Sequence, residues 1–352
     1  MSGALRKRIA RLIAAQGPIS IAEYMTIALL DPQLGYYRVA DPLGAGGDFI
    51  TAPEISQMFG ELIGAWLADA WLKQGRPAQP LLVELGPGRG TLMADVLRVI
   101  KQAVPDLFEQ AEINLVEVSS PLWESQAEKL TPIQKRVRWR NGIEELPHDR
   151  PLFLVANEFF DALAVRQYVR TERGWCERMV GADASGALVF VLSPVVLPAA
   201  NVPADRDGAP MGGVFETSPL GEALAEEIGF RIARNGGAAL IVDYGYDTPG
   251  FGETLQAVKR HRFADVLREP GSADISTHVD FPALARAAGR GGAAAFGPVG
   301  QGAFLTALGI VQRADRLNDT AGLARLTDPE QMGTLFKALA IMPKTAAAPA
   351  GF

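Results

Sequence analysis

The sequence has few of the residues that form disulfides and metal sites. Its single cysteine, Cys176, cannot form an internal disulfide, which favours a reducing compartment. Its three histidines, at positions 148, 261 and 278, show no metal-ligand spacing with that cysteine. We therefore predict that the protein holds no metal ion.

Basic charge and long apolar runs are also scarce. The net charge of −6 argues against binding to nucleic-acid backbones, which requires a basic face. No apolar run approaches the roughly 18 residues of a transmembrane helix. With 352 residues, 48% apolar and 21% charged, the chain fits one or two globular domains with a sizeable core.

The first segment is basic, with Arg6, Lys7, Arg8 and Arg11 and no acid before Glu23. It could be read as a weak transit peptide, which would place a eukaryotic protein in the mitochondrial matrix. However, it contains little serine, and its apolar residues recur at the spacing of an amphipathic helix that Gly17-Pro18 ends. We therefore favour an ordinary first helix and a cytoplasmic bacterial protein.

Residues 81–91 carry the clearest functional pattern. Leu81–Val83 predicts a buried strand that ends in Glu84, and residues 91–101 have apolar side chains at helical spacing. Glycines at 86, 88 and 90 lie between the two. Strand, glycine turn and helix together predict the first unit of an α/β doubly wound sheet, whose ligands lie at the carboxyl ends of the strands.

The spacing of these glycines narrows the kind of ligand. A dinucleotide-binding turn would have its third glycine at 91, where the chain has Thr91, and a phosphate-binding loop of the Walker type would need a lysine. The pattern E-x-G-x-G-x-G instead resembles the first motif of class I S-adenosylmethionine-dependent methyltransferases. The alternatives are a structural turn or another nucleotide fold. The predicted cofactor contacts in this stretch are Glu84, Gly86, Pro87, Gly88, Gly90 and Thr91.

The next two strands extend the predicted cofactor site. Residues 113–118 form the second strand, and Glu117 near its end can accept two hydrogen bonds from the ribose of a nucleoside. The third strand is predicted at 137–140. In class I methyltransferases the residues that follow it usually contact the adenine, which implies that role for Asn141, Gly142 and Ile143.

The fourth strand, predicted at 152–156, opens into Asn157-Glu-Phe-Phe-Asp161. Class I methyltransferases hold the methyl acceptor at this position, and Asn157 would also face the cofactor. Two carboxylates, Glu158 and Asp161, suit a cation, and the donors of a guanidinium match carboxylates in a bidentate manner. The alternative is a capped strand end, with Asp161 as the N-cap of the next turn.

The remaining segments complete the predicted architecture. Residues 1–75 are expected to form a helical N-terminal cap, with a cofactor-covering loop that contributes Asp48 and Thr51. Residues 76–352 would form a seven-stranded Rossmann-like methyltransferase domain, interrupted by a substrate-recognition insertion at 164–235. Its fifth strand is predicted at 238–242, and strands six and seven at 293–296 and 304–308. The basic stretch 259–268 is expected to be a solvated face, and the tail after Lys344 to be frayed.

The chain as a whole resembles the MidA-like family of class I methyltransferases, which includes a mitochondrial assembly factor of respiratory complex I. The resemblance covers nearly the whole chain and rests on residues 17–25, 47–55, 83–91, 157–162, 242–245 and 274–281. It implies S-adenosylmethionine as the cofactor and a protein arginine as the acceptor, with a complex I core subunit as a candidate substrate.

The chemistry of methyl transfer to an arginine suggests roles for the predicted site residues. Glu158 and Asp161 would grip the guanidinium, and Asp243 or His278 would take up the proton. Two other functions stay open: a small-molecule methyltransferase, and an assembly factor that binds the cofactor without catalysis. An oxidoreductase that uses NAD is disfavoured by Thr91 in place of the third glycine.

Overall fold

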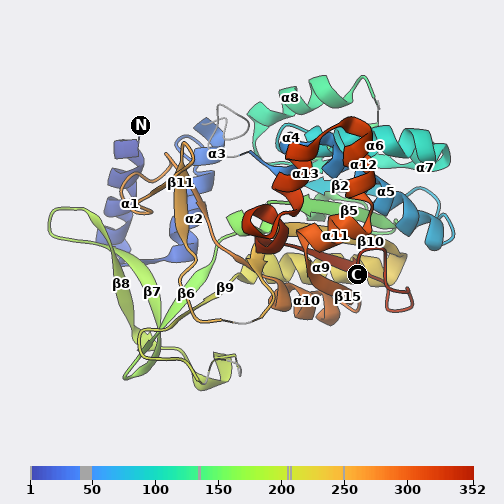
Figure 1. The fold of residues 1–352 in the computed structure, drawn as a ribbon. Helices are drawn as coiled ribbons and strands as arrows, with labels where there is room; N and C mark the ends of the chain where they lie inside the picture. Colours follow the sequence, from blue (N-terminus) through green and yellow to red (C-terminus); the bar gives the residue numbers. More distant parts are fainter. Residues whose placement is uncertain (1, 40–49, 134–135, 204–205, 207, 249) are drawn as a thin grey trace. The chain divides into compact units, whose positions relative to one another are not determined.

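The structure is a computed structural model that describes residues 2–39, 50–133, 136–203, 206, 208–248 and 250–352 (Figure 1). The chain divides into two compact units. Unit 1 comprises residues 1–49, 162–221 and 248–280, and unit 2 comprises residues 50–161, 222–247 and 281–352. Each unit is therefore assembled from three separate stretches of the sequence.

Unit 2 is built on a sheet whose main path, among the described residues, has seven strands, the number predicted from the sequence. In spatial order they are β15 (Ala294–Gly300), β16 (Phe336–Met342), β10 (Gly237–Tyr246), β5 (Leu152–Asn157), β2 (Leu81–Leu85), β3 (Glu112–Val116) and β4 (Val137–Arg140). The five strands from β10 to β4 run parallel, whereas β16 is antiparallel to both of its neighbours. This mixed α/β sheet confirms the predicted fold class.

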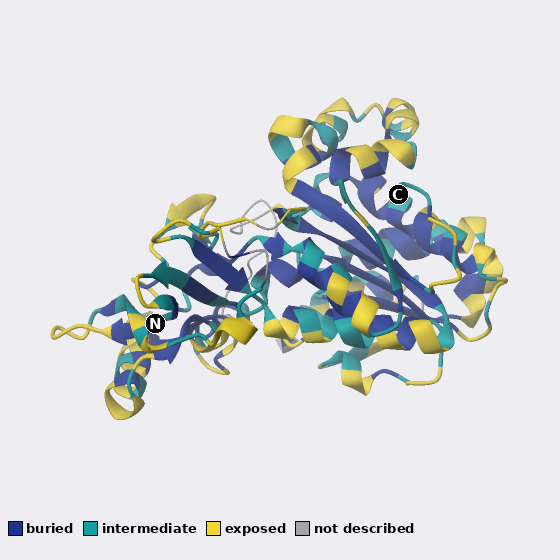
Figure 2. Cartoon of the chain, turned by 90° about the horizontal axis from the view of Figure 1, so that it is seen from below, coloured by how far each residue is buried: buried dark blue, intermediate teal, exposed yellow. Residues whose placement is uncertain are grey.

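The central strands are buried along their length, which explains their continuous apolar sequences. All residues of β2, β5 and β16 are buried, as Figure 2 shows for the strands at the centre of the sheet. Helices on both faces of a parallel sheet exclude water from it and favour such sequences. In Figure 1, α9 (Pro219–Asn235) and α10 (Phe281–Arg290) lie below the sheet, and α6 (Thr91–Ala103) and α7 (Pro105–Gln110) lie above it.

Helix α5 (Gln57–Lys73), preceded by α4 (Ala52–Ile55), packs closely against α6 in unit 2. A Cβ atom at Gly60 would lie 2.6 Å from the Asp95 side chain, and one at Gly64 would lie 2.9 Å from the Val96 backbone. These glycines let the two helices approach each other. Unit 2 begins at residue 50, so α4 and α5 belong to it. From the sequence, the residues of both helices are expected in an N-terminal cap of residues 1–75.

Two predictions about the C-terminal part were wrong. Residues 304–308, predicted as a strand, lie in or next to α11 (Gln301–Ala307), and the missing strand is β16. The tail after Lys344 is packed rather than frayed. Trp66 Nε1 donates a hydrogen bond to the Ala350 carbonyl at 3.1 Å, and the ring centroids of Phe352 and Phe304 lie 5.3 Å apart.

Unit 2 contains further helices. Helices α12 (Ile310–Leu317) and α13 (Thr320–Thr327) lie between α11 and β16 in the sequence, and α8 (Ser120–Leu130) precedes β4.

Unit 1 combines three N-terminal helices with two antiparallel sheets. Its helices are α1 (Ser2–Gln16), α2 (Ile21–Leu30) and α3 (Tyr36–Val39). The larger sheet contains β1 (Ile19–Ser20), β6 (Arg166–Thr171), β7 (Gly174–Ala182), β8 (Leu188–Val196) and β9 (Val214–Thr217). The smaller one has the order β12 (Arg262–Ala264), β11 (Gln256–Lys259) and β13 (Asp274–Ser276). Within the part of the chain that the structure describes, no helix is both long and apolar enough to span a bilayer.

Candidate functional site

The glycine turn after β2 has the backbone conformation that its sequence predicts. Gly86, Gly88 and Gly90 have φ angles of 62°, 52° and 75°. Residues with a side chain are strained in this left-handed region. The Gly86 N–H donates to the Val116 carbonyl at 3.0 Å, and the Gly90 N–H closes a turn onto the Pro87 carbonyl at 2.7 Å. The turn therefore leads directly into α6, at the carboxyl end of β2 beside that of β3.

Gly86 also forms part of a close contact with the end of β5. A Cβ atom at Gly86 would lie 2.7 Å from Cδ2 of Phe159, closer than real Cβ contacts come. The glycine turn and the Asn157–Asp161 segment are therefore brought together by adjacent strands, β2 and β5. Two of the predicted site segments meet at one edge of the sheet.

Two buried polar atoms at this edge have no hydrogen-bond partner within the described part of the chain, Glu84 Oε2 and Asn157 Oδ1. Glu84 is 3% exposed, and burial raises the pKa of its carboxyl group to about 8, with a smaller upward effect from Glu117. Because unpaired buried polar atoms are costly, they mark a place where a polar ligand would supply partners.

Glu117 belongs to a network that the sequence did not reveal. The Gln126 side chain, on α8, donates to the Gly88 carbonyl at 2.7 Å and to Glu117 Oε2 at 3.4 Å, and it accepts from Trp139 Nε1 at 2.8 Å. Gln126 is fully buried. It thereby ties the glycine turn to the acid after β3. Nearby, Lys129 Nζ donates to Thr91 Oγ1 at 2.7 Å.

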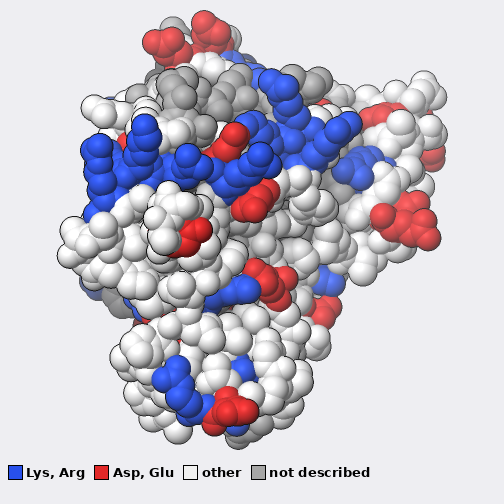
Figure 3. Space-filling view, turned by 90° about the vertical axis from the view of Figure 1, so that its left-hand side faces the viewer, with Lys and Arg blue, Asp and Glu red and all other residues white. Residues whose placement is uncertain are grey.

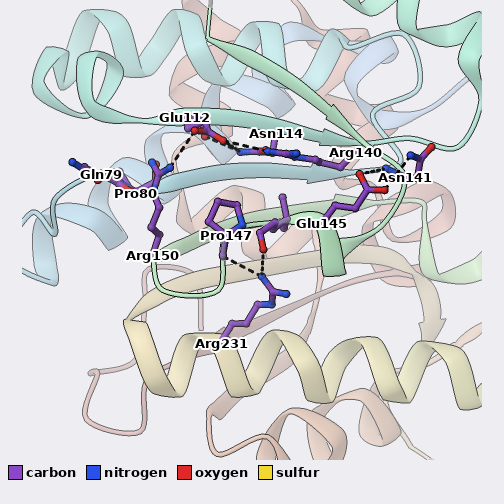
Figure 4. A network of polar contacts seen from close by, with 11 residues as sticks. Gln79, Pro80, Glu112, Asn114, Arg140, Asn141, Glu145, Pro147, Arg150 and Arg231 are labelled. Carbon is purple, nitrogen blue, oxygen red and sulfur yellow. Dashed lines mark hydrogen bonds and ion pairs between the residues drawn. The ribbon is translucent and has the colours of Figure 1, made fainter.

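The predicted adenine segment lies at the carboxyl end of β4, next to Glu117. The Glu117 N–H donates to the Arg140 carbonyl at 2.9 Å. The Asn141 side chain is exposed and donates to Glu145 Oε1 at 3.1 Å, as Figure 4 shows. Gly142 lies under the Glu144 carboxylate, and Ile143 opens the 3-10 turn η1 (Ile143–Glu145). These three residues therefore share the sheet edge with the glycine turn.

The opposite edge of the sheet carries a structural network instead (Figure 4). There Arg150 pairs with Glu112 at 3.1 Å and donates to the Gln79 carbonyl at 2.7 Å. These residues stand at the amino ends of β2, β3 and β5 and join them. Ligands of doubly wound sheets bind at the carboxyl ends, so this network serves stability.

Glu158 adopts an unusual backbone conformation directly after β5. Its φ angle is 50°, in the left-handed region that non-glycine residues rarely adopt. Glu158 Oε1 accepts the backbone N–H of Ala52 at 3.0 Å and the Asn157 side-chain amide at 3.2 Å. Burial, with a smaller contribution from the neighbouring Asp161, raises the pKa of this carboxyl group to about 7. A strained and perturbed acid of this kind is typical of functional sites.

Asp243, at the end of β10, organises the backbone of the same segment. Its Oδ2 accepts the N–H groups of Phe159, Phe160 and Asp161 at 3.1, 3.0 and 3.2 Å. Its Oδ1 accepts the Tyr244 N–H at 2.9 Å. The side chain is fully buried, which raises the pKa of its carboxyl group well above the ordinary range, together with Asp161 and Glu158. The three acids are therefore one electrostatic cluster.

Asp161 does not act as the N-cap that the alternative interpretation assigned to it. It lies inside the 3-10 turn η2 (Phe160–Ala162), and its Oδ2 accepts a 2.5 Å hydrogen bond from the Tyr244 hydroxyl. Tyr244 is not among the site residues predicted from the sequence, although it directly follows Asp243.

The remaining predicted site residues are Thr51, Asp48 and His278. Thr51 is the N-cap residue of α4, directly before Ala52. Asp48 lies outside the residues that the structure describes. His278 lies in unit 1, where its backbone N–H donates to Thr254 Oγ1 at 2.9 Å and burial lowers the pKa of its imidazole. The structure does not test the roles predicted for these residues.

Comparisons with known proteins decide the family. Residues 62–299 match the model of the family described as "Putative S-adenosyl-L-methionine-dependent methyltransferase". The chain belongs to this MidA-like methyltransferase family. A zebrafish (Danio rerio) relative, named protein arginine methyltransferase NDUFAF7, mitochondrial, is 41% identical over 96% of this chain and 86% of its own. The human (Homo sapiens) protein of the same name is 39% identical over 94% of this chain and 81% of its own.

A solved structure supports both the fold and the cofactor. A Burkholderia thailandensis protein crystallised with bound S-adenosyl-homocysteine is 30% identical to this chain, with a TM-score of 0.87. The match covers 100% of this chain and 95% of that protein. The chain is therefore an S-adenosyl-L-methionine-dependent methyltransferase, which confirms the predicted enzyme class and cofactor.

Proposed function

We propose that this methyltransferase acts on arginine side chains of proteins, and that Glu158 and Asp161 hold the acceptor guanidinium. The observation that carries the proposal is the acidic cluster at the carboxyl ends of β5 and β10, where Asp161 adds to the effect of burial in raising the pKa of both Glu158 and Asp243. A cation that pairs with these acids would relieve their repulsion. The curated relatives named protein arginine methyltransferases support the same acceptor.

The cofactor would be held at the neighbouring end of β2. The residues there fit it, because Glu84 Oε2 and Asn157 Oδ1 are buried acceptors without partners in the described chain. The glycine turn from Gly86 to Thr91 would let the backbone come close to the cofactor, and Glu117 would accept hydrogen bonds from the ribose hydroxyls. Asn141, Gly142 and Ile143 would border the adenine. When bound, S-adenosylmethionine supplies a methyl group on a sulfonium.

The acids then have to prepare a poor nucleophile. The pKa of an arginine guanidinium is roughly 12.5–13.8, so its nitrogen lone pairs are delocalised. Carboxylates that accept hydrogen bonds from two of its nitrogens would draw positive charge toward themselves and orient the third nitrogen. Glu158 and Asp161 provide the oxygens. Asp243 already accepts four backbone N–H groups, so we assign it to positioning the segment rather than to proton uptake.

The acceptor protein and its location belong to the same proposal. The resemblance to the MidA-like family implies a complex I core subunit, and the relatives are named as mitochondrial. We propose a respiratory-complex subunit as the first acceptor to test, in the cytoplasm of a bacterium or in the matrix of a mitochondrion.

The experiment uses S-adenosylmethionine with a radiolabelled methyl group and a cell lysate separated into proteins and metabolites. Label in the protein fraction, recovered as methylarginine after hydrolysis, is the expected result. Label confined to metabolites would show a small-molecule methyltransferase instead. Absence of transfer to either fraction, with binding of S-adenosyl-homocysteine intact, would leave only a cofactor-binding assembly factor and refute the proposal.

A further inference from the structure

Unit 1 carries a basic face that the methyl-transfer site does not use. Helix α1 exposes Arg6, Lys7, Arg8 and Arg11, and the chain has no acid before Glu23. Arg8 pairs with the buried Asp31 at 2.7 Å. Figure 3 looks at the side of the molecule where α1 and β11 lie in Figure 1, and it shows Lys and Arg gathered in a band. This band stands out on a chain whose net charge is −6.

The hairpin between β11 and β12 adds to this face and is strained. Lys259 and Arg262 are partners across the hairpin, which leaves Arg260 and His261 as the two turn residues. Their φ angles are 51° and 59°. Tight two-residue hairpins of this kind prefer Asn-Gly, because left-handed backbone conformations disfavour larger side chains. A turn that keeps Arg and His at such positions points to a use for their side chains.

The same hairpin exposes an aromatic side chain beside a hollow. Phe263, on β12, is 81% exposed. A cavity of about 320 Å³ next to it has a mixed lining, with the bases Lys259 and Arg268 and the acids Asp265 and Glu269. Lys259 pairs with Glu269 at 3.0 Å. A partner could therefore place an apolar group on Phe263 and negative charges near the exposed Arg260 and Arg262 of the hairpin.

The helix and the hairpin are held on one core. Leu5, Ile9 and Ile13 of α1 are buried in the same cluster as Ala257 of β11 and Ile275 of β13. A Cβ atom at Gly271 would lie 2.8 Å from the Leu5 side chain, which shows how closely α1 approaches the segment before β13. The basic residues of α1 and of the hairpin are thus presented by one packed body.

We propose that this basic face, formed by Arg6, Lys7 and Arg11 of α1 with Arg260, Arg262 and Phe263 of the hairpin, docks an acidic segment of the protein substrate. The proposal rests on the proposed function, because it assumes a protein acceptor. Electrostatic complementarity of this kind speeds association and selects partners more than it adds affinity.

A membrane or a nucleic acid fits this face less well. The apolar side of α1 is buried in the core, so the helix cannot insert it into a lipid surface as amphipathic membrane helices do. Among the described residues of α1 and the hairpin, Phe263 is the only large apolar side chain that is exposed. Single-strand binding surfaces stack several bases on aromatic rings, and one ring does not provide that.

Fluorescence anisotropy of the full chain with a fluorescein-labelled peptide of alternating glutamate and glycine tests the docking. The double variant Arg260→Glu/Arg262→Glu is expected to bind about fivefold to tenfold more weakly and with a smaller salt dependence. The control, Arg173→Glu/Arg234→Glu, changes the net charge equally at exposed positions outside the face. We expect it to bind nearly as well as the unmodified chain.

Equal weakening in both variants, or in neither, would overturn the proposal. So would tighter binding of the unmodified chain to phosphatidylserine vesicles or to a single-stranded oligonucleotide than to the peptide. In the transfer assay, the hairpin variant should raise KM for an arginine peptide with an acidic extension and leave an extension-free peptide unchanged. Failure of the proposed function would appear as no transfer to either peptide by the unmodified chain, a result on which the anisotropy measurement does not depend.

Discussion

Glu158 Oε1 accepts the backbone N–H of Ala52 at 3.0 Å, across 106 positions of the sequence. This bond joins the start of α4 to the acidic segment after β5 and holds one carboxylate oxygen in place. Under the proposed function, the other oxygen contacts the acceptor. The geometry agrees with a carboxylate that is oriented before the acceptor arrives, which is how active sites lower the cost of reorganisation.

Replacing Glu158 with glutamine tests this arrangement. The amide oxygen can still accept the Ala52 N–H, but the charge that attracts a guanidinium is lost. We expect kcat to fall by about 10²–10³, the usual range for loss of one electrostatic contact to a transition state. Calorimetry should show S-adenosyl-homocysteine binding unchanged. The control is Glu128→Gln on the exposed side of α8, which should transfer methyl groups normally. Normal turnover by Glu158→Gln would disprove the assignment.

The glycine turn makes a second prediction. In Gly86→Val the new side chain would strike the Phe159 ring, from which even a Cβ atom would be only 2.7 Å away, and would strain a residue with φ of 62°. We expect cofactor binding to be abolished while the circular dichroism spectrum stays that of a folded protein. Gly75→Val separates the two effects, because Gly75 has a φ of 80° but nothing within 4 Å of its Cβ position. It should lose stability, by roughly 1–2 kcal/mol, and bind the cofactor normally.

The parallel strands were predictable because a strand that is buried on both faces has a continuous apolar sequence. Leu81–Val83 and Leu152–Ala156 are uninterrupted apolar runs, and the acids that follow them mark the carboxyl edge where the site lies. The last strand was not predicted, because Lys337 interrupts the apolar sequence of β16. In the structure its charge is paired with Asp247 at 3.1 Å. Residues 304–308 offered an equally apolar run, although they belong to or adjoin a helix.

Side-chain partnerships were less predictable than strands. The sequence indicated Glu117 as a ribose acceptor, but nothing in it marked Gln126 as the residue that ties Glu117 to Gly88. Asp243 was a candidate for proton uptake on position alone. Its four backbone N–H donors become visible only when β10 lies beside β5. Contacts that join distant segments depend on packing, which a single sequence does not specify.

Glu84 makes the stability of the protein dependent on pH. Its pKa is raised from 4.5 to about 8 by burial, so between these values the folded chain binds more protons than the unfolded chain. The contribution of Glu84 to the free energy of unfolding should therefore be largest below about pH 4.5 and should fall as the pH rises to about 8. In Glu84→Gln this contribution disappears, and urea unfolding from pH 5 to pH 8 should show a flatter profile, by about 1–4 kcal/mol over the range.

Glu124→Gln, at an exposed position of α8, is the control for this measurement and should reproduce the unmodified profile. If the Glu84→Gln profile has the same slope as that of the unmodified chain, the carboxyl group of Glu84 is not titrating in this range. Saturating S-adenosyl-homocysteine provides an independent check, because a ligand that supplies partners to Glu84 Oε2 should change the same slope.

Tyr244 is expected to position Asp161 for the acceptor. Its hydroxyl donates the 2.5 Å hydrogen bond to Asp161 Oδ2, and Tyr244→Phe removes that bond without changing the ring that packs against Phe336. We expect kcat/KM for an arginine peptide to fall about tenfold, which corresponds to about 1.4 kcal/mol. S-adenosyl-homocysteine affinity should stay the same. A purely structural role would instead lower the free energy of unfolding and leave the pH profile of kcat/KM unmoved. A positioning role shifts its acidic limb, because Asp161 without the hydroxyl donor is protonated more readily.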